Sequence, residues 1–224
     1  DDAAGRWLVD VLRSEGVDVS GLSMVEEPTG RAFITVDASG ENSIVVVPGA
    51  NNAVGRGNDV AIPKCGIVLT QLEIPVPTVE KLLSQARKAG IRTVLNPAPA
   101  TSFSAGLVAS CDIVVPNEGE LEMLGGADVM LGHGVENVVV TRGAHGAQVI
   151  SQSGAVDIAP YSVDPVDTVG AGDAFVGAMC AELSRGASLE DACKVAAVAG
   201  ALATTVRGAV PSLPMFAEVR RIYG

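Results

Sequence analysis

The apolar positions of the first fifty residues predict one helix followed by a hairpin. Residues 4–15 place four apolar side chains on one helical face, and Gly16 follows as a stop. Residues 31–37 and 43–47 are rich in β-branched residues and are joined by a short loop that contains Gly40. Two such runs joined by a glycine-containing loop predict a β-hairpin.

From residue 66 onward, short apolar runs alternate with helical patterns. The expected strands are 66–70, 92–95, 112–115 and 137–141, and the expected helices between them are 78–89 and 117–124. Short apolar strands separated by helices indicate a parallel sheet that is covered by helices on both faces. The sequence therefore predicts an α/β fold with a mostly parallel central sheet.

The last third of the chain predicts a second hairpin and three helices. Residues 147–151 and 155–159 flank a Ser-Gly turn, as the strands of a hairpin do. The expected helices are 174–183, a helix opened by Ser188 with Asp191 three residues later, and 215–223. No repeat, linker or low-complexity segment divides the chain, so residues 1–224 are expected to form a single domain.

The connection between residues 124 and 137 departs from this regular pattern. A parallel crossover needs about a dozen residues and commonly contains a helix. Here residues 125–128 are mostly small and run on too quickly for the usual crossover helix. We therefore expect that this chain lacks a segment near Gly126 and Ala127.

Composition and charge narrow the class of partners. With 48% apolar residues the chain can bury a full core, and its net charge of −11 disfavours nucleic acid and anionic membranes. The four cysteines are scattered, without a C-x-x-C pair, which is typical of buried thiols in a reducing compartment. The chain contains no twenty-residue apolar span, so we expect a soluble cytoplasmic protein.

The stretch 167–175 carries the clearest candidate chemistry. Its glycine-broken loop runs into the apolar helix 174–183, so its amides lie at a helix N-terminus, where anions bind. Asp173 beside these amides can remove a proton from a hydroxyl while the amides hold developing phosphate charge. The alternative is ordinary capping, because an acidic residue is common in a first helical turn. No Lys-Ser/Thr pair follows the last glycine, so the stretch is not a Walker loop.

Polar or turn residues also follow four of the expected strands, at 71–73, 96–99, 116–120 and 142–146. Ligands in open α/β sheets bind beyond the carboxyl ends of the strands, so these segments predict one shared cleft. Each segment taken singly has a structural alternative. Asn117, for example, is a good N-cap residue with Glu120 at the third helical position.

The string D-T-V-G-A-G-D-A-F (167–175) resembles the signature of the ribokinase-like (PfkB) family of carbohydrate kinases. Five other strings resemble this family in the family's own order and extend the likeness over nearly the whole chain: G-E-N-S-I-V-V-V-P-G-A-N (40–51), L-T-Q-L-E (69–73), N-P-A-P-A (96–100), P-N-E-G-E (116–120) and T-R-G-A-H-G (141–146). The resemblance implies a three-layer sandwich with a small β-lid, of which 31–47 is the remnant.

The resemblance also implies site residues. Asp173 matches the catalytic base, and Gly170, Ala171 and Gly172 match the anion hole. Glu73 matches a sugar-binding carboxylate, and Glu120 matches a residue that positions water-bound Mg²⁺. The positions that match nucleotide contacts are Asn117, Thr141, Arg142, Gly143, Ala144, His145, Gly146, Gly172 and Ala197. The positions that match a K⁺ site are Asp167, Val169, Ala203, Val206, Gly208 and Ser212.

The implied activity is phosphorylation of D-ribose to D-ribose 5-phosphate by ATP, with Mg²⁺ and with K⁺ as activator, in a homodimer. The alternatives are another sugar or nucleoside kinase of the family, similar to a fructokinase or an adenosine kinase, and a non-catalytic truncated homologue. Residues 2–5 resemble a D-x-x-G that lies inside the family's pattern. The N-terminal strands, several sugar contacts and part of the lid that precede it in the family are expected to be missing from this chain.

Overall fold

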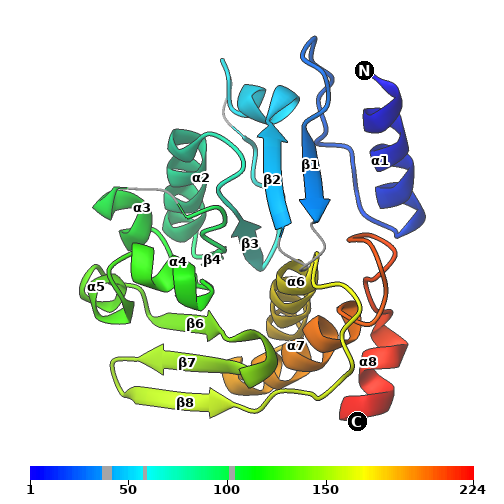
Figure 1. The fold of residues 1–224 in the computed structure, drawn as a ribbon. Coiled ribbons are helices and arrows are strands. Elements are labelled where there is room, and N and C mark those ends of the chain that lie inside the picture. The colour runs from blue at the N-terminus through cyan, green and yellow to red at the C-terminus, as the bar shows by residue number, and fades with distance from the viewer. Residues whose placement is uncertain (37–41, 58–59, 101–103) are drawn as a thin grey trace.

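A six-stranded sheet lies at the centre of the molecule (Figure 1). The computed structural model describes residues 1–36, 42–57, 60–100 and 104–224. The strands lie in chain order across the sheet: β3 (Ile67–Thr70), β4 (Arg92–Leu95), β5 (Ile113–Val114), β6 (Asn137–Thr141), β7 (Ala147–Ser151) and β8 (Gly154–Ile158). Strands β3 to β6 are parallel to one another, and β7 and β8 add an antiparallel hairpin. The predicted mostly parallel sheet is confirmed.

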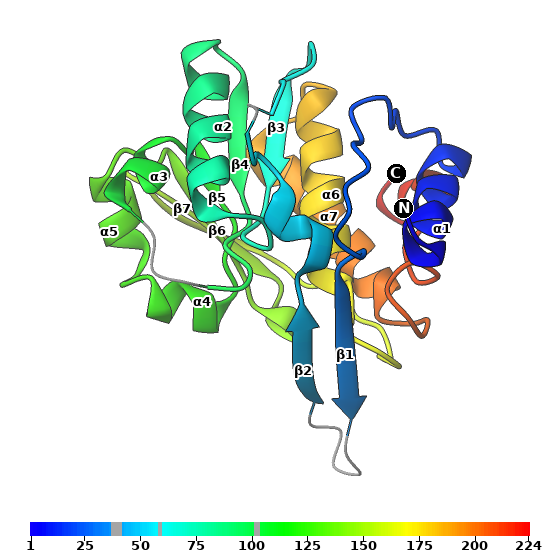
Figure 2. The ribbon, with the colours of Figure 1, turned by 90° about the horizontal axis from the view of Figure 1, so that it is seen from above.

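Helices cover both faces of this sheet (Figure 2). One face is covered by α2 (Val76–Lys88), α3 (Ala105–Ala109) and α5 (Ala127–Gly132), and the other by α6 (Ala171–Ser184) and α7 (Leu189–Ala203). The last helix, α8 (Phe216–Tyr223), packs on α7 through the buried Val219. These layers form the three-layer sandwich that the resemblance implied.

The sheet separates two cores, and this explains why its middle strands are largely apolar. On β4, Val94 packs toward α6 and α7, whereas the next residue, Leu95, packs toward α2 and α3. On β5, Ile113 and Val114 divide in the same way, because successive strand residues point to opposite faces. The buried polar residue Thr93 of β4 is satisfied, since its hydroxyl donates to the Ser110 carbonyl (2.9 Å).

The crossover between β5 and β6 contains one helix more than the sequence analysis expected. Besides the expected α4 (Glu118–Met123), helix α5 buries Met130 and Leu131 against the sheet. Gly125 and Gly126, with φ of 83° and 92°, make the turn between the two helices. The expectation that residues 125–128 run on without a further helix was therefore wrong, whereas the expectation of a missing segment near Gly126 and Ala127 stays a prediction.

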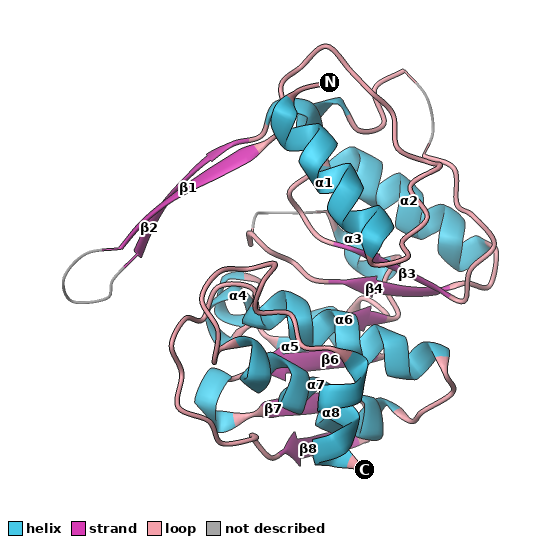
Figure 3. Cartoon of the chain, turned by 90° about the vertical axis from the view of Figure 1, so that its right-hand side faces the viewer, coloured by secondary structure: helices cyan, strands magenta, loops and turns pink. Residues whose placement is uncertain are grey.

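The N-terminal part lies apart from the central sheet. Helix α1 (Ala3–Ser14) is capped by Asp2, whose carboxylate accepts hydrogen bonds from the backbone N–H groups of Gly5 (2.8 Å) and Thr29 (3.0 Å). Strands β1 (Arg31–Val36) and β2 (Asn42–Val47) form the expected hairpin, which projects from the body of the molecule (Figure 3). Most of the predicted connection at 38–42 lies outside the described residues, which omit 37–41. In the part of the chain that is described, no helix has the length and apolar content needed to cross a membrane.

Candidate active site

Helix α6 begins with open amides, as the sequence predicted. Gly170 is the N-cap residue, in the left-handed conformation with φ of 81°, and no side chain caps the helix. The first bond of the helical i→i−4 type runs from the Ala174 N–H to the Gly170 carbonyl (2.9 Å). The N–H groups of Gly172 and Asp173 precede that bond and point out of the helix end, where an anion is favoured.

Asp173 is the third residue of this helix and is exposed. Within the described residues its carboxylate takes part in no hydrogen bond or ion pair. A carboxylate that caps its own helix would accept a backbone N–H, as Asp2 does at α1. The capping alternative for Asp173 therefore has no support in the contacts, and the side chain is available to a ligand.

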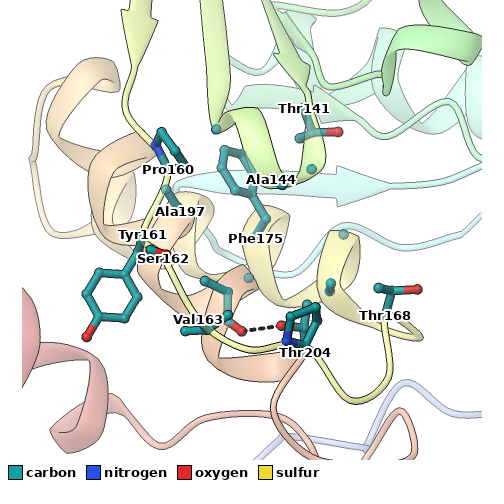
Figure 4. A pocket seen from close by; sticks show the side chains of 17 residues that line it. Thr141, Ala144, Pro160, Tyr161, Ser162, Val163, Thr168, Phe175, Ala197 and Thr204 are labelled. Carbon is teal, nitrogen blue, oxygen red and sulfur yellow. Dashed lines mark hydrogen bonds between the residues drawn. The ribbon is translucent and has the colours of Figure 1, made fainter.

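A cavity of about 390 Å³ opens beside the start of α6 (Figure 4). It lies between the turn η2 (Gly143–His145), the loop after β8, and helices α6 and α7. Its walls comprise Thr141, Gly143, Ala144, Gly146, Pro160, Tyr161, Ser162, Val163, Pro165, Thr168, Ala171, Gly172, Phe175, Ala197, Gly200, Ala201 and Thr204. Six of the nine residues expected to contact the nucleotide are among them, namely Thr141, Gly143, Ala144, Gly146, Gly172 and Ala197.

The other three expected nucleotide contacts, Asn117, Arg142 and His145, do not line the cavity. The Arg142 guanidinium donates to the Asp157 carboxylate (2.7 Å) and to the Ala147 carbonyl (3.1 Å), which ties it to the β7–β8 hairpin. His145 is exposed at the tip of η2. The backbone of this turn, rather than these two side chains, forms the cavity wall.

Gly146 is required where the turn returns to β7. Its φ is 82°, and a Cβ atom at this position would lie 2.1 Å from the carbonyl oxygen of Ile158. Any other residue would push the hairpin away from the turn. The expectation of a glycine turn at 141–146 thus has a packing reason.

Sequence reasoning missed the segment 160–165, which crosses one side of the cavity between β8 and the glycine loop. Pro160, Tyr161, Ser162, Val163 and Pro165 all line the cavity. The two prolines indicate a non-helical connection. Nothing in the local sequence says which surface such a connection crosses. Its place became visible only with the packing of α6 and α7.

Asn117 and Glu120 form a reciprocal cap at the start of α4. The Asn117 side chain accepts the Glu120 N–H, and the Glu120 carboxylate accepts the Asn117 N–H, both at 2.8 Å. Burial raises the pKa of the Glu120 carboxyl above its ordinary value. A parallel bridge joins Asn117 to Thr141, so this cap lies next to the cavity wall. Asn117 therefore caps α4, as the structural alternative expected, and it also lies beside the cavity.

The carboxyl ends of the parallel strands form one continuous row. The Leu72 N–H donates to the Ala98 carbonyl (3.0 Å), and the Asn96 side chain donates to the Val115 carbonyl (2.9 Å). Glu73 lies at the end of this row beyond β3, exposed, with its backbone N–H bonded to the Gln71 side chain (2.9 Å). Glu73 does not line the cavity, so the structure does not bring it together with the expected nucleotide contacts.

Asp167 joins two loops that are far apart in the sequence. One carboxylate oxygen accepts the Val169 N–H (3.0 Å) and the other accepts the Gly208 N–H (2.9 Å). These two bonds hold the pKa of Asp167 below its ordinary value, and the bond from Gly208 has the larger effect. The Gly208 carbonyl in turn accepts the Ser212 N–H (3.2 Å). Four of the six expected K⁺ residues are thus linked, while Ala203 ends α7 and Val206 lies in the segment that follows it.

The loop that contains Gly208 also packs against the start of α6. A Cβ atom on Gly170 would lie 3.3 Å from the Cα of Ala209, so the two backbones are in close contact. No group of three or more His, Cys, Asp or Glu side chains that could enclose a metal ion occurs among the described residues. A cation bound here would depend on backbone carbonyls, on Asp167 and on water or phosphate oxygens.

Comparison with known proteins identifies the family of this chain. Residues 1–215 match the model of the pfkB family of carbohydrate kinases. The chain is 36% identical over 230 residues to a ribokinase from Haemophilus influenzae, covering 95% of this chain and 75% of that protein. Among solved structures, a ribokinase from Thermotoga maritima has 32% identity and a TM-score of 0.88, over 99% of this chain and 77% of that one.

A structure of Arabidopsis thaliana ribokinase complexed with ribose and ATP has 29% identity and a TM-score of 0.88, and the alignment covers 100% of this chain and 79% of the other. The chain thus spans about three quarters of the length of these relatives. The family model covers far more than half of the chain. This protein belongs to the pfkB family of carbohydrate kinases, which transfer phosphate from ATP to a sugar.

Proposed function

We propose that this protein phosphorylates D-ribose with ATP and yields D-ribose 5-phosphate and ADP. The observation that carries the proposal is the unpaired Asp173 carboxylate beside the open amides at the start of α6. This helix end borders a cavity of the size of a nucleotide site. The ribokinase relatives, one of which was solved with ribose and ATP, support the choice of sugar.

In the proposed reaction, Asp173 accepts the proton of the sugar's primary hydroxyl. The hydroxyl oxygen then forms a bond to the γ-phosphorus as the bond to the bridging oxygen of ADP breaks. The amides of Gly170, Ala171 and Gly172 hold charge on the transferring group. Phosphoryl transfer needs little beyond positioning and such electrostatic stabilisation, and the glycine turn at a helix end supplies both.

The sugar and the nucleotide approach from opposite sides of the helix start. We assign Glu73, at the end of the strand row, to a hydroxyl of the sugar. The cavity wall of Gly143, Ala144, Gly146 and Ala197 takes the nucleoside. Asn117 and Glu120, next to Thr141, lie toward the phosphates. We assign Arg142 and His145 to the support and rim of the turn.

Two cations complete the proposal, and the residues present fit both. Mg²⁺ would be held by the nucleotide phosphates and by water on Glu120, and it would neutralise phosphate charge. K⁺ would be held by Asp167, Ser212 and the carbonyls of Val169, Ala203, Val206 and Gly208. Since Asp167 already links the glycine loop to Gly208, an ion there would order the anion hole without contacting the substrate.

A coupled assay of ADP release tests this function. D-ribose, 2-deoxy-D-ribose, D-fructose and adenosine are offered in turn, with and without K⁺. We expect the highest kcat/KM for D-ribose and activation by K⁺. Preference for fructose or adenosine would favour another sugar or nucleoside kinase of the family. Binding of ribose without ADP release would instead favour the non-catalytic alternative.

We further propose a cytoplasmic homodimer that pairs through the projecting hairpin. Phe33 of β1 lies opposite Val45 of β2, and these side chains are 56% and 61% exposed. An apolar sheet face of this kind is an association surface. Light scattering of the purified protein should give twice the chain mass, and Phe33→Asp should halve that value while leaving the fold intact.

A further inference from the structure

The side chains that line the cavity beside α6 give it few means to read a nucleobase. None of the described residues that line it carries a charge. To separate adenine from guanine, a site must place a donor or an acceptor against the six-position of the ring, where adenine has an amino group and guanine a carbonyl. The side chains present can be checked one by one for this role.

The helical wall is apolar. It consists of Ala197, Gly200 and Ala201 of α7 together with Phe175 of α6. The carbonyl of Ala201, in the last turn of α7, is engaged by the Thr204 N–H (3.0 Å). At Gly200 a Cβ atom would lie 3.2 Å from the Ala171 carbonyl and 3.4 Å from the Phe175 Cβ, so the two helices pack closely there.

Four of the five polar side chains at the cavity are engaged or face elsewhere. The Thr204 hydroxyl donates to the Ala201 carbonyl (2.7 Å), and the Thr141 hydroxyl lies 3.5 Å from the Pro116 carbonyl. Thr168 lines the cavity next to the glycine loop, which the proposed function assigns to the phosphates. The ring of Tyr161 points away from the other labelled side chains (Figure 4).

Ser162 is the remaining polar side chain, and it cannot discriminate. It is exposed on the loop that crosses the cavity. A serine hydroxyl is both a donor and an acceptor, and it rotates to suit its partner. It would therefore donate to the carbonyl of guanine or accept from the amino group of adenine equally well.

We infer that this kinase accepts ATP, GTP and ITP as phosphoryl donors with kcat/KM values that differ by less than about 200-fold, because its nucleoside cavity recognises the purine ring and not its substituents. The inference rests on the proposed function of this site. A site that reads a hydrogen-bonding group rejects the wrong ligand by about 10⁴-fold or more, whereas an apolar pocket discriminates by about 10–200-fold. The expected ratios of kcat/KM among the three donors are those of an apolar pocket, at most about 200-fold.

The test measures ribose 5-phosphate directly by mass spectrometry, with saturating D-ribose and Mg²⁺ and each triphosphate varied in turn. Ratios of kcat/KM below about 200 between ATP and either other donor support the inference. A larger preference for ATP overturns it and assigns a base-reading hydrogen bond to the main chain of 160–165. Calorimetry with ADP, GDP and IDP applies the same threshold to binding alone. If no donor yields sugar phosphate, the proposed function fails, and the calorimetric ratios still decide base tolerance.

The Ser162→Ala variant tests the role assigned to the hydroxyl. Removal of a group that serves both bases equally should change kcat/KM for ATP and for GTP by the same factor. The ATP-to-GTP ratio should therefore stay within about threefold of the wild-type ratio. A shift of tenfold or more in that ratio would show that Ser162 reads the base and would refute the inference.

Discussion

Replacement of Asp173 by asparagine separates the catalytic interpretation of this residue from the capping one. The change keeps the size and shape of the side chain and removes its basicity. A positioned general base contributes about 10²–10⁴ in rate. At about 1.36 kcal/mol for each tenfold change, this corresponds to about 2.7–5.4 kcal/mol of transition-state stabilisation. We expect kcat to fall by that factor.

Stability should hardly change in the same variant. The carboxylate is exposed and has no partner among the described residues, so no buried group is left unpaired. The only expected loss is the attraction of a negative charge to the N-terminus of α6, which is about 0.3–1 kcal/mol at most. If Asp173 were a cap, stability would fall and kcat would follow only modestly.

The assay follows ADP release at saturating D-ribose and ATP, with urea unfolding in parallel. Asp128→Asn is the matched control, because Asp128 is also an exposed acid in a first helical turn, that of α5. The control should retain full kcat with a similarly small change in stability. Wild-type turnover in the Asp173 variant would refute the assigned role, and equal loss in both variants would point to a general helix-charge effect.

Three further predictions concern the supporting structure. Asp167→Ala should abolish activation by K⁺ and lower kcat more than it raises the KM for ribose, because the Val169 and Gly208 N–H groups lose their shared acceptor. Initial rates measured against K⁺ concentration check this prediction, and undiminished activation would contradict it. Met179→Ala should cost about 2–5 kcal/mol in urea unfolding, since Met179 is fully buried, whereas the 72% exposed Met123→Ala should change stability by less than about 0.5 kcal/mol. Burial raises the pKa of Cys111 and Cys193 to about 12 and that of Cys180 to about 11, so these three thiols stay protonated at pH 8. Iodoacetamide should therefore label only Cys65 until the protein unfolds, and mass spectrometry of the labelled protein checks this.

Local patterns determined most of the elements of this protein. The Ser188–Asp191 spacing predicted the start of α7, where the Ser188 hydroxyl accepts the Asp191 N–H at 3.1 Å. The apolar run at 138–140 predicted β6, because both faces of this strand are buried. The glycine-broken loop before an apolar segment predicted the open helix end at Gly170. Each of these signals depends on residues within a few positions of one another, so the sequence alone is enough to predict these elements.

Tertiary packing decided what the local patterns left open. Asp167 and Gly208 are 41 residues apart, and only the approach of the two loops makes them partners. Nothing in the sequence near Arg142 predicts its hydrogen bond to the Asp157 carboxylate. Helix α5 was not predicted, because the burial of Met130 and Leu131 outweighs the poor helix signal of the small residues before them. Long-range contacts arise from the summed packing of distant elements, which no single stretch of sequence specifies.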